Sequence, residues 1–141
     1  MSDRRVSITK VKCLATMKRA LERAGFETAE NVAVQLYGTT EKAALAFKEK
    51  GAGHWQLGFH KKGSEYQLFG DFHMYAPKCF KKLSSKKPRN EEMTERLEAL
   101  YQLQATVDYA ASIPGWQVTA HSKHTQVLES PKVFVDVEQT A

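Results

Sequence analysis

Hydrophobic and polar positions alternate at the start of the chain and then change to a helical period. Val6 and Ile8 alternate with hydroxyl and basic residues over 6–11, which is the pattern of a half-buried strand. Apolar side chains then recur at helical spacing over 14–24, and Gly25 supplies a stop signal. The first part of the chain therefore predicts a strand followed by a helix.

Further alternating stretches predict consecutive strands in the middle of the chain. They cover 31–38, 42–51, 54–60 and 65–75, with glycines at the junctions. In the last pair, a two-residue turn at 62–63 would place Phe59 opposite Tyr66 and gather the apolar side chains on one face. The other face would carry polar, flat or aromatic residues, namely His54, Gln56, Gly58, His60, Glu65, Gln67, Phe69 and Asp71.

A second helical stripe predicts a long helix over 91–113, which Pro114-Gly115 ends. Asn90 is expected to be its N-cap, and Glu91 and Glu92 suit the positive end of the helix dipole. The cap, the first-turn carboxylates and the Pro-Gly break are local signals, so they predict where the helix begins and ends.

The final strands complete an α+β domain. Two closing strands are predicted at 116–124 and 132–139, with 125–130 as the alternative for the second. The resulting order is β-α-β-β-β-β-α-β-β, which indicates a mainly antiparallel sheet with two helices. Two helices can cover one face of such a sheet and leave the other open.

Length and composition predict one domain spanning 1–141. Hydrophobic residues make up 42% of the 141 residues, which is enough for a core and too much for a disordered chain. No apolar run approaches the roughly 18 residues that a membrane span needs. The polar N-terminus lacks the apolar stretch of a signal peptide. A cytoplasmic protein is therefore expected.

The net charge of +5 is unevenly distributed. Residues 1–90 hold 18 Lys and Arg against 8 Asp and Glu, a net charge of +10. Residues 91–141 hold 3 Lys and Arg against 8 Asp and Glu, a net charge of −5. This asymmetry favours nucleic acid or another acidic surface as a partner, and opposite patches would also allow copies of the chain to associate.

A long loop expected over 76–91 contains KCFKKLSSKKPRN, a basic run without an acid. Lys and Arg relieve the repulsion between phosphates and release condensed counterions, and cations gathered on one side could neutralise roughly 6–10 phosphates. The alternative is a solvated loop that only keeps the protein dispersed. The expected phosphate-binding residues are Lys78, Lys81, Lys82, Lys86, Lys87 and Arg89 of the loop, together with Arg4, Arg5, Lys10, Lys12, Lys61 and Lys62.

Aromatic and histidine side chains near the end of the second hairpin are candidates for base contacts. Stacking a base on an aromatic ring contributes about 1–3 kcal/mol. Phe69, His73 and Tyr75 are expected at the RNA, with Tyr37 as a further aromatic candidate. The alternative is that Phe69 and Tyr75 pack under a helix, because sheets often bury both faces.

Neither a metal site, a cofactor nor a catalytic centre is predicted. His54 and His60 lie six residues apart in one strand, or roughly 20 Å, which is too far for one ion. Cys13 and Cys79 lack the paired spacing of a zinc site. No sequence motif with a known catalytic mechanism is present, so an enzyme is not expected.

Four stretches resemble, in their order, a small family of unknown function from cyanobacterial, plastid and phage genomes. They are SITKVK, MKRALERAGFE, LGFHKKGSEYQLFGDFHMY and LEALYQLQATVDYAASIPGWQV. The resemblance spans roughly residues 6 to 128 and implies no catalytic residue. In size, charge and topology the chain is also similar to the chimallin C group of RNA-binding proteins from nucleus-forming jumbo phages. That resemblance implies a Whirly-like fold and binding of phage messenger RNA at the phage nucleus.

The sequence thus predicts a non-enzymatic RNA-binding protein. Contacts would be mostly electrostatic and sequence-tolerant, because Lys presents a point charge rather than the fork of Arg. Single strands would be preferred through stacking, with DNA left open as an alternative to RNA. The alternative function is a protein–protein adaptor whose basic face docks on an acidic partner, such as a phage shell protein, or on another copy of itself.

Overall fold

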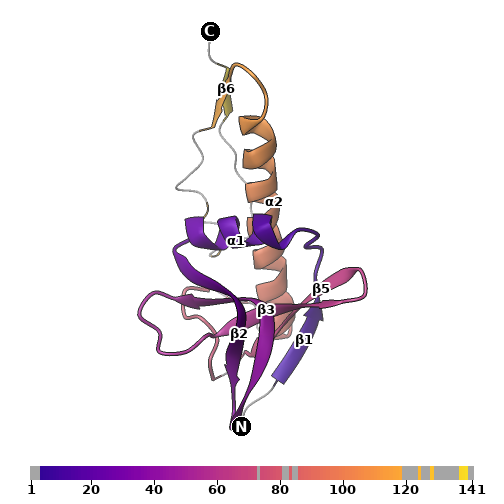
Figure 1. The fold of residues 1–141 in the computed structure, drawn as a ribbon, viewed down its shortest axis with the longest axis vertical. Coiled ribbons are helices and arrows are strands. Elements are labelled where there is room, and N and C mark those ends of the chain that lie inside the picture. Colours follow the sequence, from indigo (N-terminus) through magenta and orange to yellow (C-terminus); the bar gives the residue numbers. More distant parts are fainter. Residues whose placement is uncertain are drawn as a thin grey trace.

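The computed structural model describes residues 4–72, 74–80, 83, 86–118, 124, 128 and 137–139, and among these the side chains of 4, 5, 116–118 and 137–139 are not included. Its elements follow the order β-α-β-β-β-β-α-β-β (Figure 1), so the predicted α+β class and element order are confirmed. The elements are β1 (Arg4–Ile8), α1 (Leu14–Arg23), β2 (Phe26–Leu36), β3 (Thr39–Glu49), β4 (Leu57–Lys62), β5 (Glu65–Asp71), α2 (Arg89–Ala111), β6 (Trp116–Val118) and β7 (Val137–Gln139).

Five strands form one antiparallel sheet in the order β1-β5-β4-β3-β2. β6 and β7 pair only with each other within the described residues, in a separate antiparallel ribbon near the far end of α2 (Figure 1). The second closing strand therefore includes 137–139, as predicted, and the alternative at 125–130 lies, except for residue 128, outside the described residues. The ribbon does not extend the main sheet.

The predicted register of the β4–β5 hairpin is wrong by two residues. The turn is formed by Gly63 and Ser64, so Phe59 pairs with Leu68 rather than with Tyr66. Gly63 has a φ of +63°, a conformation that tight hairpin turns require and that glycine adopts at low cost. Because the error is an even number of residues, each side chain stays on its predicted face.

The main core lies between the helices and one face of the sheet. Aromatic rings are its centre: Phe47 meets the edge of Phe26 at 5.2 Å between centroids and lies 6.0 Å from Phe59. Burying side chains of this size is the largest source of stability in a domain of this length. Its buried members include Met17 and Leu21 of α1, Met93, Leu97 and Leu100 of α2, and Leu45, Phe47, Leu57, Phe59 and Leu68 of the sheet.

The opposite face of the sheet is also covered, although the sequence predicts that it can stay open. Val34 of β2 and Ala43 and Ala46 of β3 pack with Phe69 in a second buried cluster. The outer half of the long β2–β3 hairpin therefore folds over β4 and β5, and a backbone hydrogen bond of 2.9 Å from Gln35 to Trp55 holds it there. A strand pair folded on itself, rather than a helix, covers this face.

The start of α2 differs from the prediction in its cap. The helix begins at Arg89 after an extended Pro88, and Asn90 is not the N-cap. Instead, Asn90 Nδ2 donates a 2.8 Å hydrogen bond to Ser7 Oγ and ties the helix start to β1. Glu91 and Glu92 lie in the first turn, as predicted.

Candidate nucleic-acid interface

The histidine and aromatic residues of β4 and β5 form a closed stack rather than an open surface. His60 lies flat against Phe69 at 4.7 Å between ring centroids, and its Nε2 is 3.0 Å from Gln67 Oε1. The Phe69 side chain is 0% exposed. Its ring cannot reach a nucleic-acid base, so the predicted base contact of Phe69 is wrong. The alternative is correct in that Phe69 is buried, but residues of β2 and β3 cover it rather than a helix.

Gly58 is the position where the folded-over hairpin comes closest to β4. A Cβ atom at residue 58 would lie 2.6 Å from Ala43 Cβ and 2.8 Å from Val34 Cγ2. Glycine is therefore required sterically for the cover over Phe69.

We expect Gly58→Val to destabilise the fold by about 1–3 kcal/mol, because overpacking displaces the β2–β3 cover. Urea unfolding monitored by circular dichroism measures this change. Gly53→Val is the control, because a Cβ at residue 53 has no atom within 4 Å. Equal destabilisation by both variants would contradict the close packing at Gly58.

Tyr75 occupies a different environment, beyond the end of β5. Its backbone N–H donates to the carbonyl of Asp71 at 3.2 Å, and its ring is half-buried. The ring meets the His54 imidazole edge-to-face at 4.9 Å between centroids and an interplanar angle of 81°. In the described part of the chain, His54 Nε2 has no hydrogen-bond partner. Because His54 Nε2 is itself buried, the pair offers its rings rather than a polar atom to a ligand.

This aromatic pair lines an open hollow of about 480 Å³ at the end of β3, which we call the Tyr75 hollow. Its lining combines the two rings with an amide, a thioether, two lysines and one carboxylate, contributed mainly by Glu49, Lys50, His54, Gln56, Met74, Tyr75 and Lys78. The size suits a single planar group such as a nucleobase better than a folded peptide. The polar and apolar groups converge as they do in binding sites.

Two exposed lysines contribute to the Tyr75 hollow. Lys50 follows directly after β3, and Lys78 belongs to the predicted basic loop. The backbone N–H of Lys78 donates to Glu49 Oε1 at 2.6 Å, which anchors this part of the loop to the end of β3. The anchoring bond uses the Lys78 backbone, so the exposed ammonium group can pair with an anion.

A second group of cations lies at the opposite end of the β4–β5 hairpin. Lys61 and Lys62 are exposed beside its turn, about 17 Å along β4 from Leu57. Thr9 N donates to the carbonyl of Tyr66 at 3.1 Å, which brings the exposed Lys10 to the same end. Lys10, Lys61 and Lys62 form the tip group. The exposed Lys12 lies beside α2 instead, where its backbone N–H donates to the Tyr101 hydroxyl at 3.2 Å.

The remaining described cations of the basic loop lie at the start of α2. Lys86, Lys87 and Arg89 are exposed there. Lys87 Nζ contacts both carboxylate oxygens of Glu95 at 2.9 and 3.0 Å, and this hydrogen-bonded pair raises the pKa of Lys87. The charge of Lys87 is thus partly compensated within the protein. The described cations form separate groups, not the single group on which the predicted 6–10 phosphate contacts depend.

Several predicted RNA-binding residues lie outside the described part of the chain. His73, Lys81 and Lys82 are among them, and so are the side chains of Arg4 and Arg5, whose backbone forms the first residues of β1. Conversely, sequence reasoning missed Lys50, Gln56 and Met74 of the hollow. Their signal was weak, because a glycine turn and a change of strand separate them in sequence and only the fold brings them together.

Tyr37, the further aromatic candidate, lies outside the hollow. Tyr37 is 62% exposed at the β2–β3 turn and away from the hollow lining.

Among the described residues, no three His, Cys, Asp or Glu side chains converge as metal ligands would. Neither described helix combines the length and the apolar character that a membrane span needs.

Comparisons with known proteins found no matching family model, no matching curated protein and no matching solved structure.

Proposed function

We propose that this protein binds single-stranded RNA without catalysing a reaction, and that the Tyr75 hollow accepts one base. The observation that carries the proposal is the edge-to-face pair of Tyr75 and His54 in a hollow that two exposed lysines share. An aromatic surface beside cations matches the two parts of a nucleotide, because the base offers a π-face and the phosphate a negative charge.

The hollow also offers one group that can hold a base edge. Gln56 Oε1 already accepts the backbone N–H of Glu49 at 2.8 Å, so its amide nitrogen is the group that can donate to the polar edge of a base. Glu49 lies in the same lining and repels a phosphate, so the phosphate is expected toward Lys50 and Lys78. One stacked base with adjacent phosphates on the lysines is the arrangement that these charges favour.

The tip group extends the electrostatic part of the proposed surface. Lys10, Lys61 and Lys62 lie at the opposite end of the β4–β5 hairpin from the hollow, so a strand of several nucleotides is needed to reach both. Because all of these cations are lysines, binding should tolerate many sequences and depend strongly on salt. This surface can compensate phosphates without selecting particular bases.

We expect Tyr75→Ala to weaken the binding of a single-stranded RNA by about tenfold, since one stacking contact is lost. Duplex RNA should lose less than threefold, because its bases are already stacked on each other. Fluorescence anisotropy titrations with both RNAs at one low ionic strength measure these changes.

Tyr109→Ala is the matched control, because Tyr109 is 70% exposed on α2 and does not line the hollow. Its affinity for both RNAs should equal that of the wild type. Equal losses for single strand and duplex in Tyr75→Ala would argue against stacking. No binding of any RNA by the wild type would refute the proposed function and favour the adaptor.

A further inference from the structure

β1 lies at the edge of the main sheet, where the described residues supply no further strand. Thr9 N donates to Tyr66 in β5, so alternate residues of β1 turn their backbone groups toward β5. The backbone N–H and C=O groups of Val6 and Ile8 therefore point the other way, to the free edge. An edge of this kind is a template for another extended chain.

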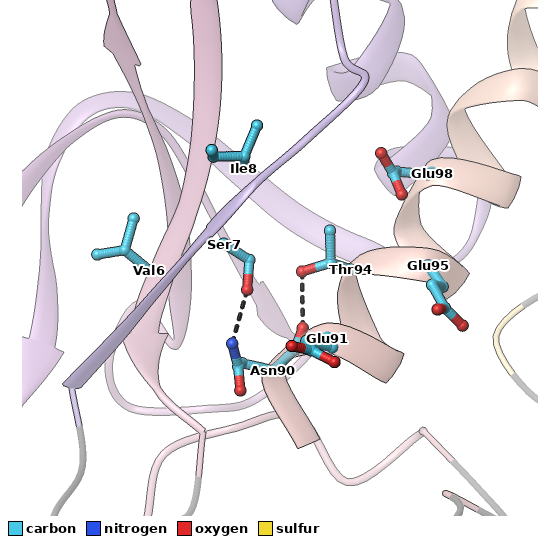
Figure 2. A pocket seen from close by; sticks show the side chains of 8 residues that line it. All are labelled: Val6, Ser7, Ile8, Asn90, Glu91, Thr94, Glu95 and Glu98. Atoms are coloured by element: carbon cyan, nitrogen blue, oxygen red, sulfur yellow. Dashed lines mark hydrogen bonds between the residues drawn. The ribbon is translucent and has the colours of Figure 1, made fainter. Parts of the chain in front are cut away.

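The free edge opens onto a groove of about 420 Å³ between β1 and α2 (Figure 2). Ser7 faces the helix and meets Asn90, whereas Val6 and Ile8 lie on the opposite side of the strand. The Ile8 side chain is 64% exposed, which is unusual for an isoleucine in a sheet. The groove thus has an apolar side and a helix side.

Carboxylates line the helix side of this groove. Glu91, Glu95 and Glu98 follow one another along α2 (Figure 2), and because Glu95 pairs with Lys87 at 2.9 Å, Glu91 and Glu98 contribute most of the negative charge. Glu98 Oε2 already accepts the backbone N–H of Lys10 at 2.6 Å, just beyond the end of β1. This bond shows that α2 lies close enough for its carboxylates to reach groups along the edge of β1.

We propose that this groove binds an extended basic peptide, which adds a strand antiparallel to β1. Backbone hydrogen bonds to Val6 and Ile8 would hold the peptide, and side-chain alternation would set its sequence. The peptide residues opposite Val6 and Ile8 lie on the same face of the sheet as these two side chains and are β-branched or apolar. The residues between them face α2 and are Lys or Arg, which pair with the glutamates.

The charge of the groove decides against two other occupants. A nucleic acid would bring phosphates against three carboxylates. A second copy that paired β1 with β1 would place its own acidic α2 near the first, and like charges repel. A basic peptide is the partner that the charges and the backbone groups both favour, and it leaves the Tyr75 hollow free.

The test uses a fluorescein-labelled peptide of about eight residues, the length of a typical strand with short flanks, that alternates lysine and valine. We expect saturable binding in anisotropy titrations with the full chain. Two methylated peptides report on the strand geometry. N-methylation of the valines removes the N–H groups that face β1, so it should weaken binding at least about tenfold, whereas N-methylation of the lysines should change it less than threefold.

Charge is tested with a triple variant, Glu91→Gln, Glu95→Gln and Glu98→Gln, which keeps the hydrogen-bond acceptors. It should bind the peptide about tenfold more weakly. The matched control is Glu27→Gln, Glu30→Gln and Glu65→Gln, which removes the same charge from exposed positions outside the groove and should bind as the wild type does.

Three results would overturn the proposal. One is that a peptide with all lysines at one end and all valines at the other binds as tightly as the alternating peptide, since this indicates charge attraction alone. Another is equal weakening by both triple variants. The third is a dimer in sedimentation experiments that Ile8→Lys dissociates, without peptide binding to either form, because a second copy would then occupy the edge. None of these readouts involves RNA, so they are independent of the proposed function.

Discussion

Replacing Lys50, Lys61, Lys62 and Lys78 together with alanine is expected to weaken single-stranded RNA binding about a hundredfold at low ionic strength. Two of these lysines belong to the Tyr75 hollow and two to the tip group. Each lost phosphate contact should make the slope of log K against log salt concentration less negative by about 0.7, so four contacts change it by about 3. Anisotropy titrations over a range of salt concentrations measure both quantities.

The two halves of this variant separate the contributions of the hollow and the tip. The Lys50 and Lys78 pair and the Lys61 and Lys62 pair should each account for about half of the slope change. Lys42→Ala with Arg23→Ala is the control, because both are exposed cations outside these two groups. A loss in this control as large as in either pair would show that binding follows net charge and has no defined surface.

Phe47→Ala is expected to lower the free energy of unfolding by about 3–5 kcal/mol, the cost of a cavity in a well-packed core. Phe47 is 0% exposed and contacts the rings of Phe26 and Phe59. Because domains of this size have a total stability of roughly 5–15 kcal/mol, the variant should be close to unfolding at 37 °C. Urea denaturation monitored by circular dichroism gives the difference.

Tyr109→Ala serves as the control for the same measurement, because its ring is exposed on α2. Its free energy of unfolding should change by less than about 0.5 kcal/mol. A loss below about 1 kcal/mol for Phe47→Ala would contradict the position of the main core between the helices and the sheet.

The sequence predicted those parts of the fold that depend on local periodicity and on breakers. Alternation at Val6 and Ile8, the helical stripe that ends at Gly25 and the break at Pro114-Gly115 each mark an element that the structure contains. The hairpin register failed because Gly63 can occupy either position of a two-residue turn. Only the pairing itself, Lys62 with Glu65, distinguishes the two.

Long-range packing explains what the sequence could not predict. Phe69 alternates along β5 with core residues, as an aromatic residue on an exposed face of a sheet also would. Its burial depends on β2 and β3, which fold over it. Asn90 has the residue type and position of an N-cap, yet its partner is Ser7, which is distant in sequence. Likewise, Lys50, His54 and Tyr75 meet only because the ends of β3 and β5 lie together.

The sequence predicted the types of residue at the candidate surface better than it predicted where they lie. Basic residues were expected to gather on one side, and the described ones divide between the hollow, the hairpin tip and the start of α2. Charge composition indicates the sign of a partner but not the geometry of the contact. The fold reduces the long list of candidate cations to the few that lie beside an accessible aromatic ring.

Photocrosslinking of a single-stranded RNA that contains 5-iodouridine, followed by mass spectrometry of the crosslinked peptides, tests the central claim most directly. This base reacts with aromatic side chains that it touches. We predict crosslinks at Tyr75 or His54, which high salt suppresses together with binding. Crosslinks confined to Tyr37 or Tyr109, or none in dilute buffer, would contradict it.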